Sequence, residues 1–178
     1  MSVYEESRAQ VGAVIRRLAE EHGEFEVIDK TWEHPRTRHE AIVERYENGG
    51  LGGGGVWLTN ERGEVLLVRN VGDDGWADPG GKVEPGETHE RAAKREVREE
   101  AGVDCRITGV LEVHWIENRC VEGDAPAVCE AIVIFTGKYV DGKPRPREGE
   151  IAEVGWFSAP PEEVLYEEVR TRSYSEIE

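Results

Sequence analysis

The stretch that decides the fold is residues 81–103, GKVEPGETHERAAKREVREEAGV. The part from Thr88 to Ala101 predicts one helix, and Gly102 suits the position after its end, where positive φ is common. Three glutamates crowd the last turns of this helix: Glu96, Glu99 and Glu100. Glutamates there face the negative end of the helix macrodipole, which is locally unfavourable. Either they belong to one solvated face of a very acidic protein, or they share a strongly positive partner.

The spacing of these glutamates indicates which partner would suit them. Glu99 and Glu100 follow Glu96 by three and four residues, so the three carboxylates lie on one helix face within one turn. Grouped carboxylate oxygens are the hard ligands that Mg²⁺ or Mn²⁺ prefers, and a bound dication turns their repulsion into attraction. The preceding loop contains Gly80 and Gly81, whose backbone can approach a ligand closely. The stretch therefore predicts a divalent-metal site, with a solvated face as the alternative.

The composition of the whole chain excludes one class of partner. Its 178 residues carry a formal net charge of −16, from 31 Glu and 7 Asp against 17 Arg and 5 Lys. Such a surface repels a phosphate backbone, so we expect no nucleic-acid polymer among the partners. Strong acidity with scarce Lys also suits a cytosol rich in salt, because screening reduces the repulsion between carboxylates. The composition thus indicates an acidic, halophile-like protein.

Cysteine usage and hydropathy indicate the compartment. The chain has three cysteines, an odd number without Cys-x-x-Cys spacing: Cys105, Cys120 and Cys129. This pattern favours reduced core residues over a disulfide framework or a zinc knuckle. No apolar run reaches membrane-spanning length, and residues 1–20 lack the hydrophobic segment of a signal peptide. We therefore expect a soluble, cytoplasmic protein without a membrane partner.

Hydrophobic periodicity on both sides of the central helix predicts an α+β order of elements. We expect helices over residues 2–22 and 36–50, strands over 25–32, 105–117, 129–140 and 151–159, and a hairpin that turns at ERGE (61–64). A last helix is expected to begin at Pro160 and Pro161, because proline suits the first helical position. The tail after Ser173 is expected to fray. These elements describe mixed strands around one central helix, with about 50 additional residues in front.

Residues 81–103 resemble the Nudix box, G-x5-E-x7-R-E-U-x-E-E-x-G-U, in which U is a bulky aliphatic residue. Every fixed position of the box is matched, by Gly81, Glu87, Arg95, Glu96, Val97, Glu99, Glu100, Gly102 and Val103. The flanking stretches GEVLLVRN, GWADPGG and EVGWFSAPPEEV are also similar to those of the family. The resemblance covers roughly residues 52–170 and implies a Nudix hydrolase domain at residues 51–173. It does not cover residues 1–50, which their periodicity predicts to be an N-terminal helical extension.

The resemblance implies a fold, an activity and a role for each matched residue. The fold would be a mixed β-sheet sandwiched between α-helices, with a partly helical N-terminal extension. The activity would be the divalent-metal-dependent hydrolysis of a pyrophosphate bond in a nucleoside diphosphate derivative or a nucleoside triphosphate, with Mg²⁺ or Mn²⁺ as the cofactor. Glu99, Glu100 and the Gly81 carbonyl would bind the metal. Glu96 would be a further ligand or the base for the attacking water. Arg95 would orient Glu96, and Glu87 would hold the loop.

Weaker signals point to the substrate and to a late-loop glutamate. Trp57 and Trp115 could stack on a base, and Asp78 could accept hydrogen bonds from a base or ribose; core packing and an exposed turn are the respective alternatives. Among the late acidic residues, Glu150 is our choice for an additional metal ligand or base. Asn118 occupies a position where some relatives have a Pro or a Tyr that marks the substrate, so neither subclass is supported.

Two other classes of function compete with a small-molecule nucleotide hydrolase. A non-catalytic Nudix-like sensor would bind a nucleotide, but such domains typically lose box glutamates, and none is lost here. An acidic scaffold without a ligand would make the whole box a coincidence. Residues 1–50 have three open roles: packing on the core, forming a homodimer interface, or covering the substrate.

Overall fold

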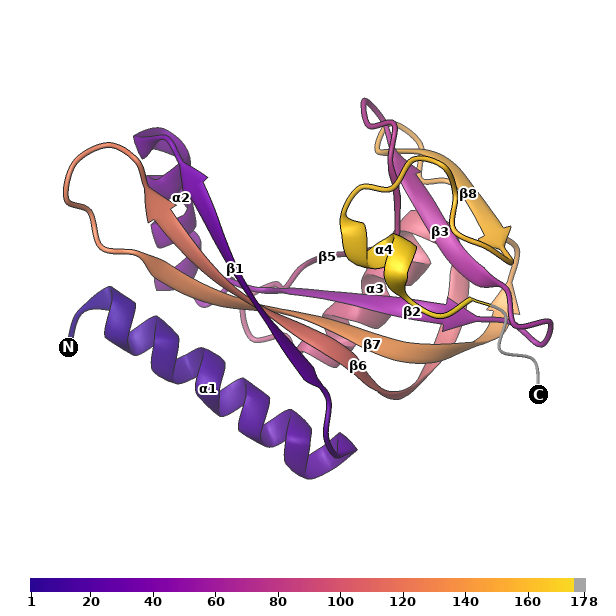
Figure 1. Ribbon diagram of the computed structural model, residues 1–178, viewed down its shortest axis with the longest axis horizontal. Helices are drawn as coiled ribbons and strands as arrows, with labels where there is room; N and C mark the ends of the chain where they lie inside the picture. The colour runs from indigo at the N-terminus through magenta and orange to yellow at the C-terminus, as the bar shows by residue number, and fades with distance from the viewer. Residues whose placement is uncertain (175–178) are drawn as a thin grey trace. The chain divides into compact units, whose positions relative to one another are not determined.

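The computed structural model describes residues 1–174 (Figure 1), and the chain divides into two compact units. The N-terminal unit comprises residues 1–54, 82–92 and 110–134, and the C-terminal unit comprises residues 55–81, 93–109 and 135–178. The expected fraying after Ser173 falls on residues 174–178. Of these, only Tyr174 is described, and its hydroxyl donates to the Val169 carbonyl at 2.7 Å; residues 175–178 lie outside the described residues. Several elements begin in one unit and end in the other, so the two units are not successive domains along the chain.

The helices and strands follow one another as an α+β chain. In order they are α1 (Val3–His22), β1 (Glu26–His34), α2 (Arg36–Glu47), β2 (Gly53–Thr59), β3 (Val65–Asn70), β4 (Trp76–Ala77), β5 (Gly80–Lys82), α3 (His89–Ala101), β6 (Val103–Cys120), β7 (Val128–Gly142), β8 (Ile151–Phe157) and α4 (Glu167–Thr171). The strands form a mixed sheet, with β1 parallel to β6 and β3 antiparallel to its neighbours. An α+β fold with a mixed sheet flanked by helices is therefore confirmed.

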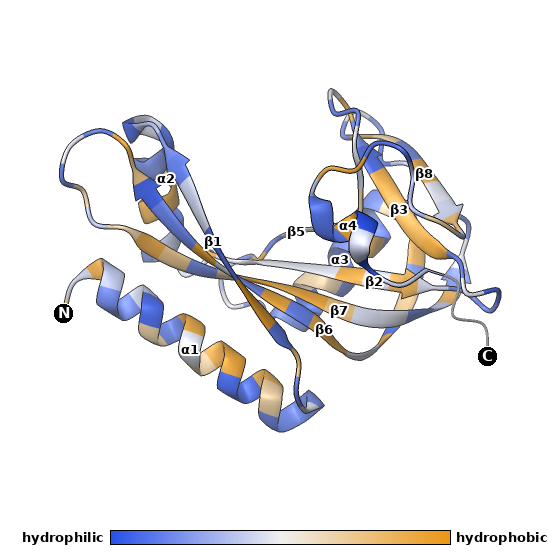
Figure 2. Ribbon diagram, viewed as in Figure 1, coloured by the Kyte–Doolittle hydropathy of each residue, from blue (hydrophilic) through white to orange (hydrophobic). Residues whose placement is uncertain are grey.

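In the N-terminal unit, α1 lies beside β7, to which a hydrogen bond joins it (Figure 1). The helix begins at a capping box, in which the Ser2 hydroxyl accepts from Glu5 N–H and the Glu5 carboxylate accepts from Ser2 N–H. Val11 and Leu18 lie on its buried face, and hydrophobic and hydrophilic residues alternate along the helix in Figure 2. The Ser7 hydroxyl accepts from the Cys129 N–H of β7 at 2.9 Å. This bond ties the helix to the sheet by a buried polar contact.

In the C-terminal unit, β3 is the central strand. Its first four residues, 65–68, are apolar and buried, and they form a continuous hydrophobic run in Figure 2. A run without polar alternation is typical of a strand that is covered on both faces. β3 pairs antiparallel with β2, through the turn at Asn60–Glu64, and with β4 along one side, and it pairs antiparallel with β8 along the other side. The predicted hairpin is thus present.

The C-terminal helix begins later than the sequence predicts. It spans Glu167–Thr171 rather than starting at Pro160 and Pro161. The reason is tertiary: Trp76 N–H donates to the Glu163 carbonyl at 3.0 Å, and Leu165 N–H donates to the Trp76 carbonyl at 2.9 Å. These residues are held extended against β4, so the local proline signal for a helix start is overridden.

Two further sequence expectations can be compared with the structure. All three cysteines are free thiols, but only Cys105 and Cys129 are buried, because Cys120 is half-exposed at the end of β6 and donates to the Glu122 carbonyl. Within residues 1–174, no helix is both long enough and apolar enough to cross a membrane.

Candidate functional site

The second half of α3 carries the box glutamates next to and across from a stripe of buried apolar residues. Ala93, Val97 and Ala101 follow one another at intervals of four residues and are fully buried. This apolar stripe fixes the rotation of the helix, so Glu96 and Glu99 point away from the core. Glu100, beside the stripe, is also buried, with 8% of its surface exposed. A carboxylate with so little access to water needs compensation from the protein or from a ligand.

The end of α3 is capped by glycine and by the late loop. Gly102 has φ of +74°, and its N–H donates to the Arg98 carbonyl at 3.0 Å, as expected for the residue after a helix. The N–H groups of Arg145 and Arg147 donate to the carbonyls of Ala101 and Glu100 at 2.8 and 3.1 Å. These bonds satisfy carbonyls that a helix end otherwise leaves unpaired. They also bring the loop that contains Glu150 to the glutamates of α3.

The glycine loop ahead of the box contacts two of the three glutamates. Gly80 N–H donates to Glu100 Oε2 at 3.1 Å. A Cβ atom added at Gly81 would lie 2.5 Å from Glu96 Cδ, so no other residue fits there without moving Glu96. The close approach expected of this backbone is therefore present, and the group that it approaches is the Glu96 carboxylate. The loop and α3 form a cradle of carboxylate oxygens and backbone.

Two arginines bridge the carboxylates of the site. Arg95 Nη1 lies 2.8 Å from Glu96 Oε1 and 3.1 Å from Glu99 Oε2. Arg147 Nη1 lies 3.4 Å from Glu99 Oε2 and 3.1 Å from Glu150 Oε2. The structure thus gathers Arg95, Glu96, Glu99 and Glu150 in one ion-pair network. Glu100 instead faces Gly80.

The site holds more negative charge than its arginines neutralise. Burial raises the pKa of the Glu100 carboxyl to about 8. The hydrogen bond from Gly80 acts against this rise, whereas three further carboxylates add to it: Glu96, Glu150 and Asp78. Burial also raises the pKa of Glu96, against the hydrogen bond and the charge of Arg95. Crowded, partly buried oxygens of this kind fit a hard divalent cation, whose charge would offset both the burial and the repulsion that raise these pKa values.

The remaining box residue, Glu87, belongs to the N-terminal unit. Its carboxylate accepts from the Glu84 N–H at 3.0 Å and so closes the turn over residues 84–87. This contact agrees with a role in shaping the loop before α3. That role stays a prediction.

The three substrate candidates lie in different surroundings. Trp57 and Asp78 are in the C-terminal unit, where both contact Arg172: its guanidinium lies 4.9 Å from the Trp57 ring centroid, and its Nη1 lies 2.9 Å from Asp78 Oδ1. Trp115 is on β6 in the N-terminal unit, beside the Cys129 thiol. A substrate role for any of them stays a prediction.

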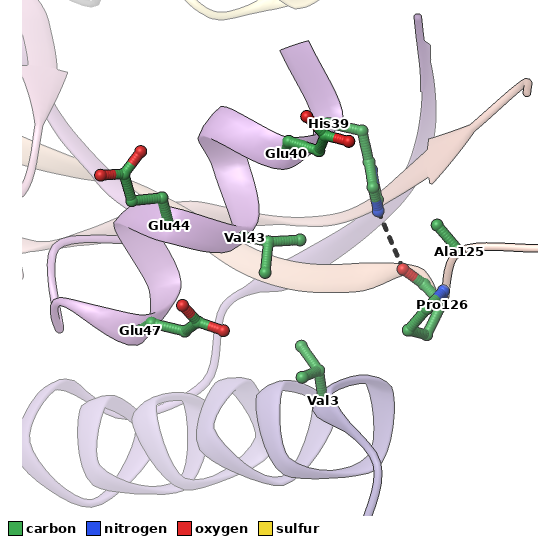
Figure 3. Close-up of a pocket in the computed structure, with 8 residues that line it drawn as sticks. All are labelled: Val3, His39, Glu40, Val43, Glu44, Glu47, Ala125 and Pro126. Atoms are coloured by element: carbon green, nitrogen blue, oxygen red, sulfur yellow. Dashed lines mark hydrogen bonds between the residues drawn. The ribbon is translucent and has the colours of Figure 1, made fainter. Parts of the chain in front are cut away.

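The N-terminal unit contains two polar features that the sequence did not single out. Glu21, His22 and Glu90 bring one ligand atom each within 4.8 Å of one another, and Arg17 lies 3.2 Å from Glu21 and 3.3 Å from Glu90. The charge of Arg17 already compensates these carboxylates. A groove with a volume of about 280 Å³ lies beside α2, and the buried His39 Nε2 lies 2.9 Å from the Pro126 carbonyl oxygen. Figure 3 shows the residues that line this groove. All residues of both features belong to this unit.

Sequence reasoning missed Arg147, Tyr166 and Arg172. Arg147 stands in a Pro- and Gly-rich loop, and the other two stand in an acidic segment that follows the last strand. No periodicity or motif marks these positions. Each becomes apparent only through contact with a carboxylate that is distant along the chain.

Comparison with known proteins agrees with this arrangement. A family model described as "NUDIX domain" matches residues 52–175. Curated relatives include proteins named RNA pyrophosphohydrolase from Yersinia enterocolitica and Yersinia pestis, each 36% identical over 81 residues, which is 42% of this chain and 46% of the relative. The aligned part of the chain thus spans about half the length of these relatives.

A solved structure shares the fold. The crystal structure of a UDP-X diphosphatase superposes with a TM-score of 0.51 at 23% identity, covering 78% of this chain and 66% of that one. At that identity the similarity concerns the fold alone. Because the family model spans well over half of the sequence, including the complete glutamate cluster, the chain belongs to the NUDIX domain family.

Proposed function

We propose that this protein hydrolyses a pyrophosphate bond in a nucleoside diphosphate derivative or a nucleoside triphosphate, with a divalent cation as its cofactor. The observation that carries the proposal is the state of Glu100. Its carboxylate accepts from Gly80 N–H in a buried position, and burial, followed by the nearby carboxylates, raises its pKa to about 8. Such crowding of carboxylates lowers the stability of the fold, and a bound cation would offset this cost.

Within this proposal, some of the oxygen ligands bind the metal, and Glu96 either joins them or takes part in proton transfer. Glu99, Glu100 and the Gly81 carbonyl would hold Mg²⁺ or Mn²⁺, whose charge neutralises the diphosphate and makes water more acidic. Glu96 would complete the ligand set or accept the proton of the attacking water.

The surrounding residues would then position these groups. Arg95, 2.8 Å from Glu96 Oε1, would orient that carboxylate, and Glu87 would hold the turn before α3. Glu150, paired with Arg147, would serve as an additional ligand or base from the late loop.

The substrate would be a small nucleotide whose charge is balanced by the bound cation. A formal net charge of −16 disfavours a long polyanion, so we propose no nucleic-acid polymer as a partner. The name of the curated relatives adds one specific alternative, the 5′ end of an RNA. A non-catalytic nucleotide sensor is the alternative from another class, and the unbroken set of box glutamates argues against it.

The organisation of the chain belongs to the same proposal. We propose that residues 51–173 carry the chemistry and that residues 1–50 form an extension, in which α1 packs on the sheet of the N-terminal unit. A homodimer interface or a cover over the substrate are its other possible roles. The acidic composition suits a cytoplasm rich in salt.

The test is a metal-supplemented screen with product masses as the readout. Nucleotide sugars, NADH, ADP-ribose, dinucleoside polyphosphates, dNTPs and a short 5′-triphosphorylated RNA are each incubated with the protein and Mg²⁺ or Mn²⁺. We expect metal-dependent cleavage of one class of small nucleotide, lost in Glu100→Gln and kept in Glu90→Gln, the same substitution at the other end of α3. Binding without turnover would favour the sensor. Turnover of the RNA alone would reassign the substrate.

A further inference from the structure

The segment of residues 163–174, here called the C-terminal clamp, contacts the chain that leads into the glycine loop. Its first contact is backbone pairing of Glu163 and Leu165 with Trp76. Beside it, a Cβ atom added at Gly75 would lie 2.6 Å from the Leu165 nitrogen. Only glycine therefore allows the two backbones to approach this closely. Clamp and loop residues alike belong to the C-terminal unit.

The second contact is a buried polar triad centred on Asp78. Arg172 Nη1 lies 2.9 Å from Asp78 Oδ1 and 2.8 Å from the Tyr166 hydroxyl oxygen, and the Tyr166 hydroxyl donates to Asp78. The side chains of Arg172 and Asp78 are only 5% and 4% exposed. A buried ion pair with this geometry is strongly directional, and removing one partner leaves an uncompensated charge.

The third contact involves Trp57 on β2. Trp57 Nε1–H donates to the Ser173 carbonyl at 3.3 Å, and the Tyr174 ring meets the Trp57 ring edge-on at 5.2 Å. The Arg172 guanidinium lies over both the Trp57 and the Tyr166 rings, at 4.9 and 5.1 Å from their centroids. Arg172 is thus enclosed by aromatic rings as well as paired with Asp78.

The chain held by the clamp reaches the glutamates within three residues. Asp78 is followed by Pro79, whose carbonyl accepts from Val56 N–H at 3.1 Å. Next, Gly80 N–H donates to Glu100, and Gly81 packs against the Glu96 carboxylate. The segment from Trp76 to Gly81 is therefore fixed at one end by the clamp and at the other end by α3.

We propose that the clamp is a positioning element for the metal site, in which Arg172 and Tyr166, acting through Asp78, set where the Gly80–Gly81 backbone lies against Glu96 and Glu100. The inference rests on the proposed function, since it concerns the cation that these glutamates would hold. It assigns the C-terminal segment a role in metal affinity without direct contact between the clamp and the ligands. Loss of an outer contact of this kind typically lowers metal affinity or activity by about 10- to 100-fold.

Arg172→Gln distinguishes a positioning role from a purely electrostatic one, because the two predict opposite changes in metal affinity. The substitution removes a positive charge next to Asp78, so Coulomb attraction alone would strengthen the binding of a cation to the nearby carboxylates. If the clamp positions the loop, the same substitution weakens binding, because the loop loses its anchor. We expect the Mn²⁺ dissociation constant, measured by calorimetry or by the EPR signal of free Mn²⁺ without substrate, to rise about tenfold or more.

Two further variants keep the test decisive. Arg170→Gln removes the same charge from the same segment, but Arg170 pairs with Glu167 at the surface, so Mn²⁺ affinity should be unchanged or slightly increased. Tyr166→Phe changes no charge and keeps the ring, so it should fold and weaken Mn²⁺ binding in the same direction as Arg172→Gln, but less. Thermal melts define a temperature at which every variant is folded.

Equal or tighter Mn²⁺ binding by both folded clamp variants would overturn the positioning role. Failure of the wild-type protein itself to bind Mn²⁺ would instead overturn the proposed function. The two failures are therefore distinguishable in one titration series.

Discussion

Glu130 of the N-terminal unit and Glu100 of the C-terminal unit are both buried, with 8% of each residue exposed, yet their surroundings differ. Glu130 Oε2 accepts from Asn118 Nδ2 at 2.7 Å, and Asn118 Oδ1 lies 2.8 Å from His34 Nε2. Burial raises the pKa of Glu130, and the groups around it act against the rise: Asn118, Arg45, His34 and Lys82. Around Glu100, by contrast, three carboxylates reinforce the rise that burial causes, and only the Gly80 hydrogen bond acts against it.

The difference shows how the surroundings of a buried glutamate distinguish a structural role from a chemical one. The network of Glu130 is compensated by an amide and by positive charges of its own unit, so the fold needs nothing more there. The cluster of Glu100 lacks such compensation, and we propose that a cation from solution completes it. Asn118 has a structural role in the network of Glu130, because its amide links the buried side chains of Glu130 and His34.

The largest expected effect comes from removing charge in the C-terminal cluster. Glu96→Gln, Glu99→Gln and Glu100→Gln should each lower kcat by roughly 10²-fold or more, because charge stabilisation by the cation is lost. Gln keeps the side-chain size, so the fold should survive. Turnover is measured on the substrate that the screen identifies, and Mg²⁺ should raise the melting temperature of the wild type but not that of the triple variant.

Glu130→Gln is the matched control for that experiment. It makes the same substitution at the same degree of burial, and it should leave kcat unchanged. A triple variant as active as the wild type, or an equally inactive Glu130→Gln, would remove the distinction between the two clusters.

The next largest effect should be on stability and should arise in the N-terminal unit. Leu18 of α1 is fully buried, so Leu18→Ala should lower the free energy of unfolding by about 2–5 kcal/mol. The increase in melting temperature that Mg²⁺ causes should be retained. Denaturant unfolding with and without Mg²⁺ measures both quantities. A cost below about 0.5 kcal/mol would show that α1 is a dispensable appendage rather than part of a core.

Salt should stabilise the protein by screening the repulsion among its excess negative charges. With a formal net charge of −16 and only 5 Lys, the protein should become more stable as KCl rises from dilute buffer to molar concentration, by a few degrees in melting temperature. Thermal melts in a KCl series, without divalent metal, test this expectation. A flat or falling melting temperature would contradict the interpretation as a protein adapted to a salty cytosol.

A smaller, pH-dependent effect is expected from Glu130. Its pKa in the folded protein lies above the ordinary value of 4.5, so ionising it costs stability as pH rises through the folded-state pKa, and the cost is absent below about pH 4.5. Glu130→Gln should therefore raise the melting temperature near pH 8. The gain should vanish near pH 4. Glu20→Gln, at an exposed position of α1, should show no such pH dependence.

The smallest effect concerns the ion pair between α1 and the start of α3. Arg17 is 37% exposed and pairs with Glu21 and Glu90, so Arg17→Gln should cost only about 0.2–1 kcal/mol. The loss should shrink in molar KCl because screening weakens the pair. A Zn²⁺- or Mn²⁺-dependent rise in melting temperature that appears only in Arg17→Gln would show that Arg17 occupies a latent cation site formed by Glu21, His22 and Glu90.

Much of the fold was predictable because its signals are local. The period of α1, the turn between β2 and β3 and the long strands β6 and β7 all follow from neighbouring residues, and so does the end of α3 at Gly102. The predicted start of the last helix was wrong, because backbone hydrogen bonds of Glu163 and Leu165 with Trp76 outweigh the proline signal. Such contacts join residues almost 90 positions apart, which no local pattern encodes.

The glutamate site also combines features that the local sequence predicts with features that only the tertiary structure decides. The box residues are recognisable from their spacing, because an α-helix places positions three and four apart on one face whatever surrounds it. Their charge state and their partners depend on the tertiary structure. Burial against Gly80, the approach of Glu150 through the late loop, and the pairing of Asp78 with Arg172 arise only when distant segments pack together. Spacing is a property of the helix alone, whereas desolvation and charge pairing are properties of everything that packs against it.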